Sequence, residues 1–74
     1  MLNACILLKV VPTRALKILE QIRNLGGVRK VYPTYGRFDM AIFLEVEDYK
    51  ELRKITTSIN TIEGIRSTET LPEA

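Results

Sequence analysis

Histidine is absent from this 74-residue sequence, and there is a single cysteine, Cys5. Histidine is the commonest general base and the commonest metal ligand, so its absence argues against an enzyme and against a metal site. One cysteine cannot form a disulfide within the chain or build a metal cluster, which fits a reducing cytoplasm. We therefore expect a non-catalytic cytoplasmic protein without a metal or cofactor, in which Cys5 is a small buried hydrophobic residue.

Long apolar runs and a strong charge bias are also missing. No run approaches the roughly 18–20 residues of a membrane span, and residues 1–4 lack the basic start of a signal peptide. Eleven basic and nine acidic residues give a net charge of +2, far from the surplus of a nucleic-acid-binding surface. The composition, 46% apolar and 27% charged, is that of a globular protein. We expect one soluble domain over residues 1–74 with no membrane contact.

Four segments have the composition of β-strands. Residues 4–11 and 40–46 are short, apolar and rich in β-branched side chains, as buried strands are. Residues 28–35 and 65–71 are more polar, and Pro33 cannot donate to a sheet ladder, which indicates an edge strand. The sequence therefore predicts two central and two edge strands.

Two segments between these strands have helical spacing. Gly26 and Gly27 end the first, because glycine accepts the left-handed conformation of a helix C-terminus. Asp48 precedes the second and Glu51 follows three residues later, as in a capping box. One face of each helix is expected to be buried, formed by Ala15, Leu16, Ile18, Leu19, Ile22 and Leu25 in the first helix and by Tyr49, Leu52, Ile55, Ile59 and Ile62 in the second.

The element order is strand, helix, strand, strand, helix, strand, and the two halves are alike. A shift of 36 residues aligns Ile6 with Ile42 and Leu8 with Leu44. Two such halves form the α+β ferredoxin-like βαββαβ fold, a four-stranded antiparallel sheet with both helices on one face.

The sheet face away from the helices is expected to be apolar as well. Both phases of the central strands are apolar. The first strand has Ala4, Ile6, Leu8 and Val10 in one phase and Cys5, Leu7 and Val11 in the other, with Lys9 as the break, and the third strand has Met40, Ile42, Leu44 and Val46 in one phase and Ala41 and Phe43 in the other. A domain this small gains little from one core, and an exposed apolar sheet promotes aggregation. We therefore expect this face to pack against a second copy of the chain.

The residues Tyr35, Gly36, Arg37, Phe38 and Asp39 form the first candidate binding site. Glycine lets a ligand approach the backbone N–H groups, Arg37 offers a fork for a carboxylate, and Asp39 can accept an ammonium group. This set of groups suits a zwitterion. The alternative is that Gly36 only makes the turn and that Arg37 and Asp39 form a surface ion pair.

Hydroxyl groups on the last strand form the second candidate. Thr68 and Thr70 project to one face of the strand, and Ser67 and Glu69 to the other. Threonine is common in strands, so a solvated edge strand is the alternative.

The segment 26–32, the Gly-x-Phe-Asp turn at 36–39 and the ending Ile-Arg-Ser-Thr-Glu-Thr at 65–70 together resemble the effector-binding (RAM) domain of the Lrp/AsnC transcription regulators. The resemblance covers about residues 3 to 71. It implies dimerisation through the sheets, assembly into octamers or decamers, and an amino-acid effector between dimers. It also assigns Tyr35, Gly36, Arg37, Phe38 and Asp39 to the ligand-binding turn, with Thr68 and Thr70 as weaker candidates.

Full-length members of that family carry an N-terminal helix-turn-helix domain, for which the residues before the first strand leave no space. The chain is similar to the stand-alone versions known mainly from archaea and some bacteria, which implies no direct DNA binding. Two functions follow, an amino-acid sensor that modulates transcription or amino-acid metabolism indirectly, and an oligomerisation adaptor for full-length Lrp/AsnC regulators. A small enzyme of the dimeric α/β-barrel type and an ACT domain share the fold, and fold analogy alone does not separate them.

Overall fold

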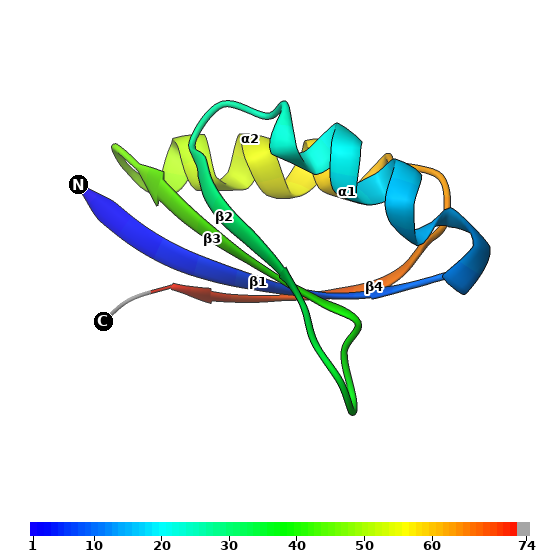
Figure 1. Ribbon diagram of the computed structural model, residues 1–74. Helices are drawn as coiled ribbons and strands as arrows, with labels where there is room; N and C mark the ends of the chain where they lie inside the picture. The colour runs from blue at the N-terminus through cyan, green and yellow to red at the C-terminus, as the bar shows by residue number, and fades with distance from the viewer. Residues whose placement is uncertain (73–74) are drawn as a thin grey trace.

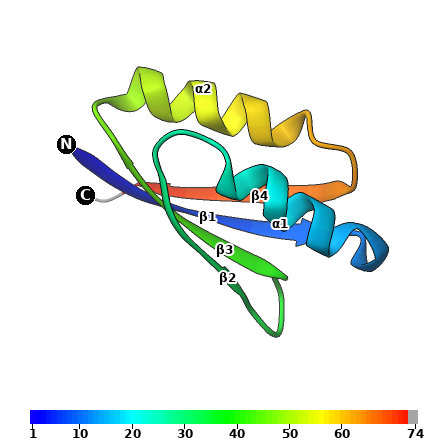
Figure 2. The ribbon, with the colours of Figure 1, turned by 45° about the horizontal axis from the view of Figure 1, so that its top comes forward.

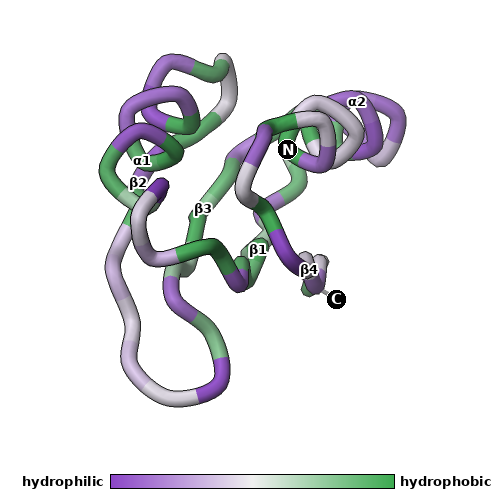
Figure 3. The backbone as a smooth tube through the Cα atoms, turned by 90° about the vertical axis from the view of Figure 1, so that its right-hand side faces the viewer, coloured by the Kyte–Doolittle hydropathy of each residue, from purple (hydrophilic) through white to green (hydrophobic). Residues whose placement is uncertain are grey.

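Four strands form one antiparallel sheet in the computed structural model, which describes residues 1–72 (Figure 1). They are β1 (Leu2–Val10), β2 (Val28–Pro33), β3 (Met40–Val46) and β4 (Ile65–Pro72). Their order is β2-β3-β1-β4, so the apolar strands lie at the centre and the polar strands at the edges, as predicted. Figure 3 shows largely hydrophobic stretches in β1 and β3. The ferredoxin-like fold is confirmed.

Both helices cover the same face of the sheet (Figures 1 and 2). A short 3-10 turn, η1 (Pro12–Arg14), leads into α1 (Ala15–Arg23), and α2 spans Tyr49–Asn60. Proline suits the first turn of a helix because no backbone donor is needed there. Across residues 1–72, no helix is long and apolar enough to cross a membrane.

The start of α2 confirms the predicted cap. Asp48 Oδ1 accepts a hydrogen bond from the backbone N–H of Glu51 at 2.9 Å. In return, Glu51 Oε2 accepts from the backbone N–H of Glu47 at 3.0 Å, one residue earlier than in the usual capping box. The two side chains together fix the direction in which the chain enters α2.

The core lies between the sheet and the helices. Its fully buried side chains are Ile6, Leu8 and Ile42 from the sheet and Ile18, Ile22 and Ile59 from the helices. Ile6 and Ile42, which the repeat aligns, are direct cross-strand partners in the two central strands, whereas Leu8 pairs with Met40 because the strands are antiparallel.

Two residues expected in the core are exposed. Leu16 is 79% exposed and Tyr49 is 61% exposed. At about 100° per residue, Leu16 is rotated by about 200° from the buried Ile18, which places it on the outer face of α1. Tyr49 opens α2 and lies at the margin of the buried stripe, about 60° from Leu52. Both expectations were wrong, because they rested on hydrophobicity, whereas the angular position of each residue places it outside or at the margin of the buried stripe.

Gly64, in the turn between α2 and β4, is the glycine whose replacement should cost the most stability. Its φ is +99°, and an added Cβ would lie 3.0 Å from Arg14 Cβ and 3.1 Å from Ile18 Cδ1. A non-glycine residue in this conformation costs about 1–3 kcal/mol, and crowding adds to that. We expect Gly64→Ala to lower the free energy of unfolding by about 2 kcal/mol in urea titrations.

Gly26→Ala is the matched control, because a Cβ at Gly26 meets nothing within 4 Å and its φ is not positive. Equal stabilities of the two variants would show that the turn rearranges around Gly64 without cost.

Candidate functional site

Residues 34–39 form the loop between β2 and β3. The loop extends beyond the strands on the side of the sheet away from the helices (Figure 1). Thr34 closes it with two hydrogen bonds, from its backbone N–H to Asp39 O at 2.9 Å and from its Oγ1 to Phe38 O at 2.7 Å. Phe38 and Asp39 are thereby held at the base of the loop, and the residues between them and Thr34 form its tip.

The loop tip is open to solvent in the single chain. Gly36 has a φ of +103°, and an added Cβ would meet nothing within 4 Å. Tyr35 is 100% exposed, and Arg37 is exposed too. The backbone conformation therefore requires glycine at position 36, while the space around it remains accessible to another molecule.

Asp39 links the loop to the end of β1. Its backbone N–H donates to Leu8 O at 2.7 Å, and its Oδ2 accepts from the backbone N–H of Val10 at 2.9 Å. A carboxylate offers about four acceptor positions, so the contact with Val10 leaves capacity for a second donor. The part-buried Asp39 carboxylate is therefore fixed in position before any ligand arrives.

The surface ion pair considered for Arg37 and Asp39 is not present. Within residues 1–72 the ion pairs are Arg14–Glu63, at 3.2 Å, and Arg29–Glu45. Arg37 thus remains available at the loop tip.

Thr68 and Thr70 lie on the helix side of the sheet, opposite Leu8 and Ile6 of β1. Thr68 Oγ1 donates to Asn60 Oδ1 of α2 at 3.1 Å. The predicted alternation along β4 is confirmed, since Ser67 and Glu69 pair with Lys9 and Leu7 on the other face. The two threonines do not join the loop tip in one chain, because β1 and β3 separate β4 from the 34–39 loop.

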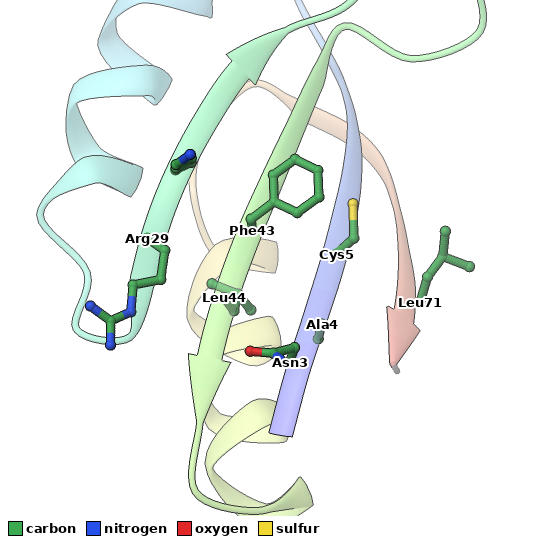
Figure 4. Close-up of a pocket in the computed structure, with 8 residues that line it drawn as sticks. Asn3, Ala4, Cys5, Arg29, Phe43, Leu44 and Leu71 are labelled. Atoms are coloured by element: carbon green, nitrogen blue, oxygen red, sulfur yellow. The ribbon is translucent and has the colours of Figure 1, made fainter. Parts of the chain in front are cut away.

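The sheet face away from the helices, which we call the open sheet face, carries apolar cross-strand pairs. Cys5 is opposite Phe43, and Leu7 is opposite Ala41. Tyr32 packs edge-on against Phe43, with ring centroids 5.8 Å apart and an interplanar angle of 73°. A hollow of about 450 Å³ lies on this face, and its lining includes Asn3, Cys5, Arg29, Phe43 and Leu71 (Figure 4).

Cys5 is only half-buried, on the open sheet face, rather than buried as expected. Burial raises its pKa above the ordinary value of 9.0, because a poorly solvated site disfavours the thiolate. The neutral thiol is a weak nucleophile. In the part of the chain that the structure describes, no group of three or more His, Cys, Asp or Glu side chains could hold a metal ion.

The main-chain contacts of Asp39 were not predicted. The N–H of Val10 and the carbonyl of Leu8 carry no residue-specific signal, so only the pairing of the strands reveals them. The Arg29–Glu45 pair was missed as well. A bulge in β2 between Val28 and Lys30 shifts the register there, which simple alternation does not anticipate.

Comparison with known proteins agrees with this architecture. Residues 3–72 match the family described as the Lrp/AsnC ligand binding domain. TTHA0845 from Thermus thermophilus is 31% identical, with a TM-score of 0.96 over 100% of this chain and 94% of that one. FFRP-DM1 is 25% identical, with a TM-score of 0.92 and complete coverage of both chains. No curated protein matches.

A longer protein shares the fold. AsnC from E. coli is 24% identical with a TM-score of 0.90, and the match covers 97% of this chain but 50% of AsnC. The match across residues 3–72 places the chain in a family of regulatory ligand-binding domains. This chain belongs to the Lrp/AsnC ligand binding domain family.

Proposed function

We propose that this protein is a cytoplasmic sensor that binds an amino acid at an interface between copies of the chain and modulates transcription or amino-acid metabolism indirectly. The observation that carries the proposal is the fixed Asp39 carboxylate at the base of a loop whose glycine backbone is accessible. A carboxylate and free backbone N–H groups are the partners that the two ends of an amino acid require.

In this proposal Asp39 holds the ammonium group, and the backbone N–H groups near Gly36 hold the carboxylate. Arg37 assists at the carboxylate, while Tyr35 and Phe38 contact the effector side chain. All five residues come from one loop with an exposed tip, so a second copy has to complete the pocket. Thr68 and Thr70 fit this site only as contributions from another copy, since their strand lies two strands away from β3.

The proposed assembly starts with a dimer formed through the open sheet face. Phe43 and Leu71 are 42% and 46% exposed there, and burying them against a second copy removes apolar surface from water. Dimers then associate through the loops into octamers or decamers. An effector that contacts two copies stabilises the state in which both are present, which couples amino-acid binding to assembly.

A relative supports the ligand class. The transcriptional regulator NMB0573 from Neisseria meningitidis has this fold, with a TM-score of 0.89 at 12% identity, and its structure is a complex with L-Met. The identity is too low to transfer methionine to this chain, but an amino acid is the class of effector to test first.

The test is a thermal-shift screen of the twenty amino acids at one protein concentration. A ligand at about 100 times its dissociation constant adds about 2.7 kcal/mol to stability, which raises the Tm of a domain of this size by several degrees. We expect one amino acid, or a chemically related group, to give such a shift while the others do not.

A flat screen on a protein that melts cooperatively would contradict the sensor function. It would favour the adaptor, in which the domain binds no effector and assembles with full-length Lrp/AsnC regulators. Mixing with such a regulator and measuring mass by light scattering would then test that function.

A further inference from the structure

The two edges of the open sheet face carry opposite charges. Lys30 of β2 is opposite Phe43, and Glu69 of β4 is opposite Leu7. Both side chains are exposed, and neither takes part in the two ion pairs of residues 1–72. The face thus has a cation at one edge and an anion at the other, with Lys9 of β1 and the Arg29–Glu45 pair among the apolar side chains between them.

Lys30 and Glu69 cannot satisfy each other within one chain. Their strands are the two edges of the order β2-β3-β1-β4. With neighbouring strands about 4.8 Å apart, three spacings separate the two backbones by about 14 Å across the sheet. Lys9 is two residues along β1 from Leu7 and is the cation of this face nearest to Glu69, but within residues 1–72 the two form no ion pair. Another molecule can therefore supply a partner for each of the two edge charges.

A second copy on this face can meet the charges in two ways. If the two-fold axis runs parallel to the strands, it exchanges the two edges of the sheet and places β2 of one copy over β4 of the other. If the axis runs across the strands, each strand lies over its own counterpart in the reverse direction, so the Lys30 edges meet each other and the Glu69 edges meet each other. Opposite charges across an interface favour the first arrangement and disfavour the second.

The strand register adds a second partner for Glu69. Glu69 pairs with Leu7, Leu7 pairs with Ala41, and Ala41 pairs with Tyr32. Glu69 and Tyr32 of β2 therefore lie at the same position along the strands. Lys30 is two residues away, about 7 Å along the strand. Rotation about an axis parallel to the strands does not change the position of a residue along the strands. Glu69 of the second copy therefore lies over Tyr32 and diagonally beside Lys30. Facing sheets are about 10 Å apart, a gap that a lysine and a glutamate together can bridge.

The geometry points to a reciprocal contact in which Glu69 of each copy binds Lys30 and the Tyr32 hydroxyl of the other, fixing a two-fold axis parallel to the strands. This inference rests on the proposed sheet-face dimer and specifies its orientation. The apolar centre supplies non-directional attraction. The charges at the edges select one orientation and one partner, as interfacial charges commonly do.

The test uses two charge-reversal variants, Lys30→Glu and Glu69→Lys. Each alone places like charges together at both edges of its homodimer, whereas a mixed dimer has opposite charges at both edges. One variant is labelled with 15N, the two are mixed, and the dimers are counted by native mass spectrometry. We expect the mixed dimer to exceed its statistical half and reach about three-quarters or more, from a tenfold preference. The double variant Lys30→Glu/Glu69→Lys should dimerise like wild type.

The matched control is Lys50→Glu mixed with Glu20→Lys, which makes the same charge changes on exposed positions of the two helices and should give half mixed dimer. A statistical mixture from the first pair, with wild type still dimeric, would overturn the orientation and leave the dimer standing. A wild-type protein that sediments as a monomer would overturn the dimer and the contact together.

Discussion

We expect the replacement of Phe43 with aspartate to convert the proposed sheet-face dimer to monomers. Phe43 is on β3 at the centre of the open sheet face, opposite Cys5 and against Tyr32. In a sheet-face dimer the substitution would place two carboxylates inside the interface, and each buried ion costs several kcal/mol. We expect the dimer dissociation constant to rise by at least about 100-fold.

The folded monomer should tolerate Phe43→Asp. The side chain is 42% exposed and lies on the sheet face opposite the core. Its neighbour on β2 is Lys30, and an oppositely charged cross-strand pair is favourable. Circular dichroism should therefore show a wild-type spectrum, while sedimentation velocity over a concentration series reports the loss of dimer.

Tyr49→Asp is the control for this experiment. Tyr49 is exposed on the helix side of the molecule, in the first turn of α2, where an acidic residue interacts favourably with the helix dipole. The Tyr49→Asp variant should have the same dimer dissociation constant as the wild-type protein. If Phe43→Asp dimerises as tightly as this control, then the open sheet face is not the interface.

The fold could be predicted because periodicity carries most of its information. Alternation in the first strand places Ala4, Ile6, Leu8 and Val10 on one side, and all four are buried. Periodicity is less informative where two neighbouring residues are both apolar. Ala15 and Leu16 are both apolar, so hydrophobicity alone does not say which of them faces the sheet. In the structure Leu16 faces outward.

The candidate site could be predicted only in part. Gly36 and Asp39 are recognisable by residue type, because a positive φ and a negative charge each need particular side chains. The link from Asp39 to the Val10 backbone has no such signature. Residues that another copy of the chain would contribute to the site are harder still to predict, because no pattern within one sequence says which surfaces of two copies contact each other.

Substituting Asp39 should weaken effector binding strongly, and the choice of substitution separates its two roles. Asparagine keeps an oxygen that can accept from the Val10 N–H but removes the charge that attracts an ammonium group. Alanine removes both, and an unsatisfied backbone donor costs about 1–3 kcal/mol of stability. We expect both variants to bind the effector at least about 30-fold more weakly, since hydrogen bonds to charged groups contribute about 2 kcal/mol.

Titration calorimetry with the effector from the thermal-shift screen measures the binding, and urea unfolding measures the stability. Asp39→Asn should lose affinity at nearly wild-type stability, and Asp39→Ala should lose both. Asp48→Asn is the matched control, since Asp48 caps α2 through Oδ1 and asparagine caps a helix as well as aspartate does. Wild-type affinity in Asp39→Asn would mean that Asp39 only anchors the loop to β1, because the Val10 contact does not need the charge whereas an ammonium group does.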